Sequence, residues 1–185
     1  ATGGRNYYRH LVCQSYVTGI GYAVSKLILP SDVIENRISV EFHYYDPYEF
    51  CIKEKDYKLE WGKPFADAGG DVPTWGLEDH MEQTLRTLKK FTDKNVAVMI
   101  GEWGAPSRKR DREEWDEEVL ARHLDSRDYY AWYMVKMCMK YDLLPLNWDT
   151  GAMIDRRTGE HKEITTIDAM MKAVAGEEYV FRTIL

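Results

Sequence analysis

The sequence predicts an α/β fold in which four parallel strands alternate with helices. Four short segments are apolar throughout or alternate apolar with polar residues, as buried strands do; they are residues 10–16, 37–45, 96–103 and 143–148. Segments with a helical spacing of apolar residues follow the second, third and fourth of these. Because strands separated by helices are joined by right-handed crossovers, we expect the four strands to form one parallel sheet.

Three helices account for the helical segments. The clearest spans residues 77–93, where apolar residues recur at three- and four-residue steps: Met81, Leu85, Leu88 and Phe91. A second is expected over residues 128–141. The third covers residues 166–175 and has a predicted apolar side made of Ile167, Met170, Met171 and Val174. Between the first two strands only a short helical turn is predicted, beginning at Pro30-Ser31-Asp32.

The composition excludes several classes of protein. Of the 185 residues, 44% are hydrophobic and 30% are charged, which predicts one folded domain and not a disordered chain. The net charge of −6 argues against a nucleic-acid partner. No apolar run approaches the ~20 residues that cross a bilayer, and no signal-peptide pattern is present. Cys13, Cys51 and Cys138 are odd in number and widely spaced, so we expect core or boundary residues, not disulfides or metal ligands.

Two long loops mark where a functional site is expected. Residues 46–75 and 104–122 each follow the C-terminal end of a predicted strand, which is where α/β proteins build their sites. Four βα units are too few to close a barrel of eight strands, and they also fit a small open sheet of the flavodoxin type. The segment Val17-Thr18-Gly19-Ile20-Gly21 could imitate a phosphate-binding loop, but the helical pattern that should follow it is missing.

Residues suited to chemistry stand at three successive strand ends. Glu102 follows an apolar strand and lies in Gly101-Glu102-Trp103-Gly104; a charge there costs free energy unless it is paired or used. His43 and Tyr45 share one face of the preceding strand, and a tyrosine hydroxyl can hold a carboxylate ionised. Trp148 ends the last strand, where an indole can form the floor of a sugar site. Each residue alone also fits a structural role, but the combination favours a site.

Three motifs together carry a family resemblance. His43-Tyr44-Tyr45-Asp46-Pro47, Gly101-Glu102-Trp103-Gly104-Ala105 and Trp148-Asp149-Thr150-Gly151 resemble the second half of family 5 glycoside hydrolases, in the bacterial endoglucanase and xyloglucanase branch. Further matches are Thr2-Gly3-Gly4-Arg5-Asn6 and Trp61-Gly62, so the resemblance covers nearly the whole chain. Trp103 stands where the family usually has Phe; the larger ring would slightly narrow the −1 sugar subsite. Thr150 stands where this branch often has Asn.

The resemblance implies a fold, a reaction and a set of roles. Residues 1–185 would be the C-terminal half of a (β/α)₈ TIM-barrel catalytic domain, with the four strands as the fifth to eighth of the barrel. Glu102 would be the nucleophile of retaining hydrolysis of β-1,4-glucan, either cellulose-like, mixed-linkage or xyloglucan. Tyr45 would hydrogen-bond the nucleophile, and His43 would contact either the sugar in the −1 subsite or the acid/base residue. The remaining substrate-binding residues would be Trp148, Trp61, Trp75, Trp103 and Asp149. No metal or cofactor is implied, and such enzymes act outside the cytoplasm, in a secreted, cell-surface or periplasmic location.

One departure from the family pattern matters most. The family carries its acid/base glutamate in an Asn-Glu-Pro motif on an earlier strand, and no Asn-Glu-Pro occurs in this sequence. Glu41 is read as a structural polar residue, Asp46 as a loop residue, and residues 108–112 as a solvated loop face. We expect an open half barrel that is inactive alone. It would bind a complementary N-terminal half, or self-associate as a fragment without turnover.

Overall fold

The core of the protein is a four-stranded parallel sheet. The computed structural model describes residues 9–31, 34–109 and 115–184. The strands β1 (Leu11–Gly19), β2 (Ile38–Tyr44), β3 (Ala97–Trp103) and β4 (Leu143–Pro145) lie in sequential order, and each adjacent pair is parallel. A flavodoxin-type sheet reverses its strand order at a switch point, whereas consecutive strands of a barrel do not. The sequential order therefore excludes the flavodoxin alternative.

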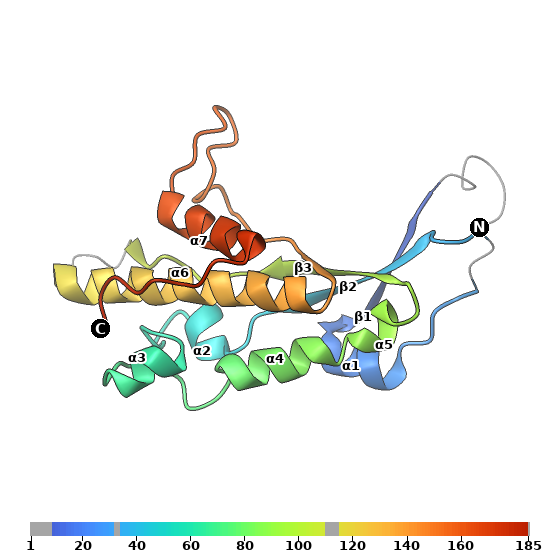
Figure 1. The fold of residues 1–185 in the computed structure, drawn as a ribbon, viewed down its shortest axis with the longest axis horizontal. Helices are drawn as coiled ribbons and strands as arrows, with labels where there is room; N and C mark the ends of the chain where they lie inside the picture. Colours follow the sequence, from blue (N-terminus) through green and yellow to red (C-terminus); the bar gives the residue numbers. More distant parts are fainter. Residues whose placement is uncertain (1–8, 32–33, 110–114, 185) are drawn as a thin grey trace.

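The described part of the chain contains seven helices. They are α1 (Ile20–Lys26), α2 (Tyr48–Cys51), α3 (Lys63–Asp67), α4 (Glu78–Arg86), α5 (Lys89–Thr92), α6 (Glu117–Lys140) and α7 (Ile164–Ala175). The long helix α6 runs across the molecule between α7 and α4 and contacts both (Figure 1). No helix among the described residues is long and apolar enough to cross a membrane.

Several predicted elements need correction. The segment after Gly19 does form a helix, α1, which the sequence pattern did not reveal. The predicted helix over residues 77–93 divides into α4 and α5, because hydrogen bonds around Thr87 tighten: its amide and its hydroxyl both donate to the carbonyl of Thr84. All four of its predicted apolar residues are buried: Met81, Leu85, Leu88 and Phe91. Part of the predicted turn at residues 30–34 lies outside the described residues.

The helix α6 begins eleven residues before the predicted start at residue 128. Asp116 caps it by accepting a hydrogen bond from the amide of Val119 at 2.8 Å, and two acidic residues follow in the first turn. The apolar spacing does not predict the first half of α6, because the side chains buried there are polar. They are His123, Asp125, Ser126, Arg127 and Asp128. The loop after β3 is correspondingly shorter than predicted.

The last helix, α7, presents a different face to the core from the one predicted. Its buried residues are Thr166, Ala169 and Ala173, while Met171 and Val174 are more than half exposed. The two alanines allow α7 to approach α6 closely, and the hydroxyl of Thr166 donates a hydrogen bond to Asp128 of α6. Small and polar residues therefore decide the orientation of this helix.

The two faces of the sheet differ in burial. On one face the side chains are buried in the main hydrophobic core; Val40, Phe42 and Tyr44 come from β2, and Val98 and Ile100 from β3. The other face carries the partly exposed polar side chains of β2. Both outer strands expose apolar residues, with Leu11 at 50% on β1 and Leu144 at 53% on β4. The partly exposed face and the two exposed edges are where the candidate site and the candidate interfaces lie.

Candidate functional site

Three predicted residues meet at the carboxyl ends of β2 and β3. The hydroxyl of Tyr45 donates a hydrogen bond to Glu102 Oε2 over 3.2 Å, and His43 Nδ1 lies 3.3 Å from the same oxygen. The side chains of His43 and Glu102 remain 24% and 27% exposed. The hydrogen bond predicted between Tyr45 and Glu102 is therefore formed, and the carboxylate of Glu102 stays open to solvent.

A β-bulge turns Glu102 toward His43. Phe42 pairs with Ile100 but the next residue, His43, pairs with Glu102, so Gly101 is an extra residue in β3. Without this irregularity, regular alternation would place Glu102 on the same covered face as Ile100. The bulge moves Glu102 to the face of His43, and it moves Trp103 to the buried face.

Gly101 also makes room for a neighbouring carboxylate. A Cβ atom at this position would lie 2.6 Å from Cγ and Cδ of Glu41 on the adjacent strand, which no side chain could tolerate without a shift. Glu41 Oε1 lies 3.1 Å from His43 Nε2, and its other oxygen accepts a hydrogen bond from Gln14 of β1. The missing Cβ therefore lets a second carboxylate reach the histidine.

Tyr45 is held as a hydrogen-bond donor. Burial raises the pKa of its hydroxyl well above the ordinary value, and the negative charge of Glu102 and the hydrogen bond to it act in the same direction. The hydroxyl consequently stays protonated across the physiological range. It can donate a hydrogen bond to the ionised form of Glu102 and stabilise that form without ionising itself.

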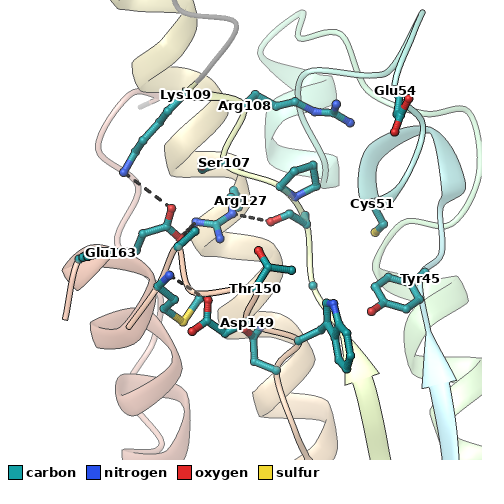
Figure 2. A pocket seen from close by; sticks show the side chains of 18 residues that line it. Tyr45, Cys51, Glu54, Ser107, Arg108, Lys109, Arg127, Asp149, Thr150 and Glu163 are labelled. Atoms are coloured by element: carbon teal, nitrogen blue, oxygen red, sulfur yellow. Dashed lines mark hydrogen bonds and ion pairs between the residues drawn. The ribbon is translucent and has the colours of Figure 1, made fainter. Parts of the chain in front are cut away.

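A cavity of about 840 Å³ opens along the segments that follow β3 and β4; it reaches Tyr45, but neither His43 nor Glu102 is among its lining residues. Tyr45 lines it, as does Trp148, whose indole is 56% exposed. Figure 2 shows Arg127 and Glu163 on one side of the cavity and Tyr45 and Cys51 on the other. A mixed lining of aromatic, charged and amide groups suits a polar ligand with flat apolar faces, such as a sugar.

An ion pair that the sequence analysis missed builds one wall. Arg127 Nη1 lies 2.6 Å from Glu163 Oε2, and Arg127 Nε donates to the carbonyl of Ala105 over 2.6 Å (Figure 2). Arg127 thereby ties the loop after β3 to the segment before α7. No local motif marks either residue, because they come together only when α6 and α7 pack.

The predicted tryptophans fall into two groups. Trp61 is fully buried and donates from Nε1 to the carbonyl of Gly76, and Trp103 is 1% exposed. Their predicted roles in substrate binding are wrong, because core packing encloses both rings. Trp148 and Trp75 are exposed at 56% and 41%. The Trp75 indole donates to Glu49 Oε1 over 3.3 Å and packs edge-on against His80.

Asp149 is occupied by its own loop. Its Oδ1 accepts hydrogen bonds from the amides of Gly151 and Met153 at 2.8 and 3.0 Å, and its Oδ2 accepts one from Ile154 at 3.3 Å. Burial alone raises the pKa of Asp149, but these amides outweigh burial and lower it. Asp149 thus holds the loop that follows Trp148; it also lines the cavity, and its role in substrate binding stays a prediction.

Of the residues predicted to form a solvated loop face, the structure describes two: Lys109 is exposed, but Arg108 is partly buried. The Arg108 guanidinium stacks 3.8 Å above the Tyr57 ring, donates to the carbonyl of Lys53 over 2.6 Å, and lines the cavity together with Lys109. Residues 110–112 lie outside the described residues. Among the described residues, no three His, Cys, Asp or Glu side chains are grouped so that they could hold a metal ion.

The sequence of the chain is similar to sequences of known proteins. The profile of the cellulases, glycosyl hydrolase family 5, matches residues 1–153. The chain is 45% identical over 179 residues to a xyloglucan-specific endo-β-1,4-glucanase of Bacteroides ovatus, covering 94% of this chain and 34% of that protein. It is 27% identical to endoglucanase A of Paenibacillus barcinonensis, covering 94% of this chain and 46% of that protein. The chain thus spans about a third to a half of the length of these relatives.

Solved structures give the same picture. A Bacteroides ovatus xyloglucanase in complex with a XXXG heptasaccharide superposes with a TM-score of 0.85 at 44% identity, over 94% of this chain and 37% of that one. A broad-specificity endoglucanase from Bacteroides salanitronis superposes with a TM-score of 0.78 at 29% identity, over 93% and 45%. The whole of the described sheet therefore corresponds to one part of a larger fold.

Proposed function

Because this chain belongs to glycosyl hydrolase family 5, we propose that it supplies the nucleophile half of a retaining β-1,4-glucanase. One observation carries the proposal: a partly exposed Glu102 accepts a hydrogen bond from Tyr45 and contacts His43, and Tyr45 in turn lines a cavity together with the exposed indole of Trp148. The whole domain is then a (β/α)₈ barrel, and residues 1–185 are its C-terminal half.

The chemistry follows from these positions. Glu102 attacks the anomeric carbon and forms a covalent glycosyl-enzyme intermediate. Tyr45 orients the attacking carboxylate, and His43 contacts the same oxygen and the bound sugar. Retaining glycosidases need a second carboxyl group about 5 Å from the nucleophile, to protonate the leaving oxygen and then activate water. The family carries that group in an Asn-Glu-Pro motif, which this sequence lacks, so the acid/base residue comes from a complementary N-terminal half.

We assign the substrate to β-1,4-glucans, with xyloglucan among them. Trp148 is the sugar platform, because its indole is exposed and lines the cavity. Trp75 is a candidate for an outer platform, since its ring is partly exposed in the loop after β2. The solved Bacteroides ovatus xyloglucanase is in complex with a XXXG heptasaccharide, which supports including xyloglucan among the substrates. A polymeric substrate of this size requires action outside the cytoplasm.

Hydrolysis of a chromogenic cello-oligosaccharide tests the proposal. We expect no turnover by the chain alone and turnover when a polypeptide with the first four strands of the barrel is added. Glu102→Gln should abolish that turnover, because the amide cannot attack or leave. Activity that survives Glu102→Gln would overturn the assignment of the nucleophile.

Covalent trapping tests the nucleophile separately from the acid/base. A 2-deoxy-2-fluoro cellobioside with a dinitrophenyl leaving group needs little protonation of the leaving oxygen, so Glu102 can attack it without the acid/base residue. We expect a mass increase of one fluorocellobiosyl unit, located on the peptide that contains Glu102. Labelling of another carboxylate in the assembled protein would contradict the proposal.

A second candidate function rests on the exposed strand edges. Leu11 and Val12 on β1 and Leu144 on β4 are 46–53% exposed, although apolar edge residues of this kind normally pack. A fragment with such edges can self-associate into a scaffold without turnover. Absence of activity both with and without the other half would favour this second function.

A further inference from the structure

A row of polar side chains crosses three strands behind the proposed nucleophile. Gln14 of β1 donates a hydrogen bond to Glu41 Oε2, and Glu41 Oε1 lies 3.1 Å from His43 Nε2 on the same strand, β2. The other ring nitrogen of His43, Nδ1, lies 3.3 Å from Glu102 Oε2 on β3. Glu41 is thus separated from the nucleophile by one imidazole ring.

We propose that Glu41 is a positioning residue for the reaction. Its carboxylate accepts a hydrogen bond from His43 Nε2 and so holds the ring with Nδ1 directed at Glu102 Oε2. The inference rests on the proposed function, because Glu102 must be the nucleophile for this positioning to affect catalysis. It reassigns Glu41 from the structural role that its place in the strand suggests.

The hydrogen-bonding capacity of Glu41, His43 and Glu102 determines which ring nitrogen of His43 carries a proton. A carboxylate can only accept a hydrogen bond, whereas each imidazole nitrogen either donates or accepts. Glu41 therefore favours a proton on Nε2. Glu102 is also a carboxylate, so it accepts a hydrogen bond from Nδ1 only when that nitrogen carries a second proton. Without Glu41, the ring could turn over or a single proton could move to Nδ1, and the hydrogen bond that the ring offers the nucleophile would change.

The surroundings of Glu41 are built to hold it. Its side chain is only 16% exposed, so leaving its charge without a partner would cost free energy. Gln14 fixes one oxygen from β1, and the missing Cβ of Gly101 leaves the space that the carboxylate occupies on the side of β3. The glycine is an independent observation, because any side chain at this position of β3 would overlap the carboxylate of Glu41.

Among the described residues, two charged groups pair with the His43 ring. They are Glu41 on its own strand and Glu102 from β3, while Gln14 and Tyr45 are the neutral groups bonded to these two carboxylates. A change in the state of the ring after substitution of Glu41 can accordingly be traced to that carboxylate. The control Glu82 is also partly buried and hydrogen-bonds to Lys140 and Tyr141, outside this row.

Nitrogen-15 NMR of the histidine rings tests the inference without any need for turnover. In the wild-type chain, with signals assigned by His43→Asn, we expect Nε2 of the His43 ring to be protonated. Glu41→Leu should shift the His43 nitrogens toward a mixture of tautomers, Glu41→Gln should restore the wild-type pattern through its amide oxygen, and Glu82→Gln should leave it unchanged. Gln14→Leu, at an exposed position of β1, should move the signals in the same direction as Glu41→Leu. Its place on the surface keeps the test valid if Glu41→Leu fails to fold.

The rate of covalent trapping in the assembled enzyme tests whether Glu41 affects the reaction of Glu102. Carboxylates that orient a histidine through its second nitrogen contribute about 10–100-fold at metal sites, and we expect a similar slowing of the labelling of Glu102 in Glu41→Leu, with affinity for the sugar unchanged. Wild-type His43 signals in both Glu41→Leu and Gln14→Leu would overturn the inference. If Glu102 is never labelled, the proposed function fails, while the ring signals still decide whether Glu41 positions His43.

Discussion

The environment of each aromatic side chain decides what it does in this protein. Trp148 and Trp61 are the same residue type, each in a segment that follows a strand, yet one indole is 56% exposed beside a cavity and the other is fully enclosed. Trp61 packs edge-on against Tyr130 and contacts Tyr129 and Tyr133. The first ring is available to a ligand, and the second holds the long loop after β2 on α6.

Replacing Trp148 should affect binding and not stability. We expect Trp148→Ala to weaken the binding of a cello-oligosaccharide to the assembled protein about tenfold, or about 1.4 kcal/mol, because a stacking surface is lost. Isothermal titration measures the affinity, and the urea midpoint should stay at the wild-type value. Unchanged affinity would remove Trp148 from the site.

Replacing Trp61 should have the opposite effect. Trp61→Ala leaves a large cavity in the core and should lower the free energy of unfolding by about 3–5 kcal/mol. Urea denaturation followed by circular dichroism measures this change. A stability equal to wild type, combined with weaker sugar binding, would restore the original prediction for this residue.

At the scale of elements, buried polar side chains of α6 determine how the C-terminal segments pack. Asp125 is fully buried and accepts hydrogen bonds from the Tyr179 hydroxyl at 2.7 Å and from the amides of Arg182 and Thr183 at 2.9 Å. Arg182 also pairs with Asp128 at 2.7 Å. A search for apolar periodicity could not find this half of the helix, because hydrogen bonds and ion pairs take the place of apolar packing there.

Asp125 should make stability depend on pH in the acid range. Burial alone raises its pKa, but the hydrogen bonds from Tyr179, Arg182 and Thr183 outweigh burial and lower it. A depressed folded-state pKa means that the stabilisation is complete above the unfolded-state pKa of about 3.9 and is lost as the pH falls through the folded value.

We expect Asp125→Ala to lower the free energy of unfolding at pH 7 by about 3–5 kcal/mol, since buried donors and Arg182 lose their partner. Urea denaturation at pH 7 and at pH 3 measures both effects. The difference between wild type and variant should shrink at the lower pH. A difference that is independent of pH would contradict the role assigned to the ionised Asp125.

At the scale of the whole molecule, the two edge strands of the described sheet, β1 and β4, each pair with a strand on one side only. Most side chains of β1 are exposed, and β4 exposes Leu144. After β4, the amides of Leu146 and Trp148 donate hydrogen bonds to the carbonyls of Ile100 and Trp103 in β3. An open parallel sheet with apolar edges is a template for further strands. The whole molecule is therefore expected to associate, either with a complementary half or with itself.

Light scattering of the isolated chain tests this expectation. We expect a mass above the 21.7 kDa of one chain, and a lysine at Leu144 should reduce association because a charged edge resists pairing. The matched control is a lysine at Met171, an exposed position on α7 away from the strand edges. A monodisperse monomer would contradict the expectation.

The sequence by itself determined the four parallel strands and the meeting of His43, Tyr45 and Glu102, because parallel strands bring their carboxyl ends to the same edge of a sheet. It did not determine which way the side chains at those ends face. The extra residue at Gly101 reverses the alternation of β3, exposing Glu102 and burying Trp103. The depth of Trp61, the capture of Asp149 by loop amides and the Arg127–Glu163 pair likewise depend on contacts between distant segments. Only the tertiary structure decides them, because burial and hydrogen-bond partners are properties of the packed chain.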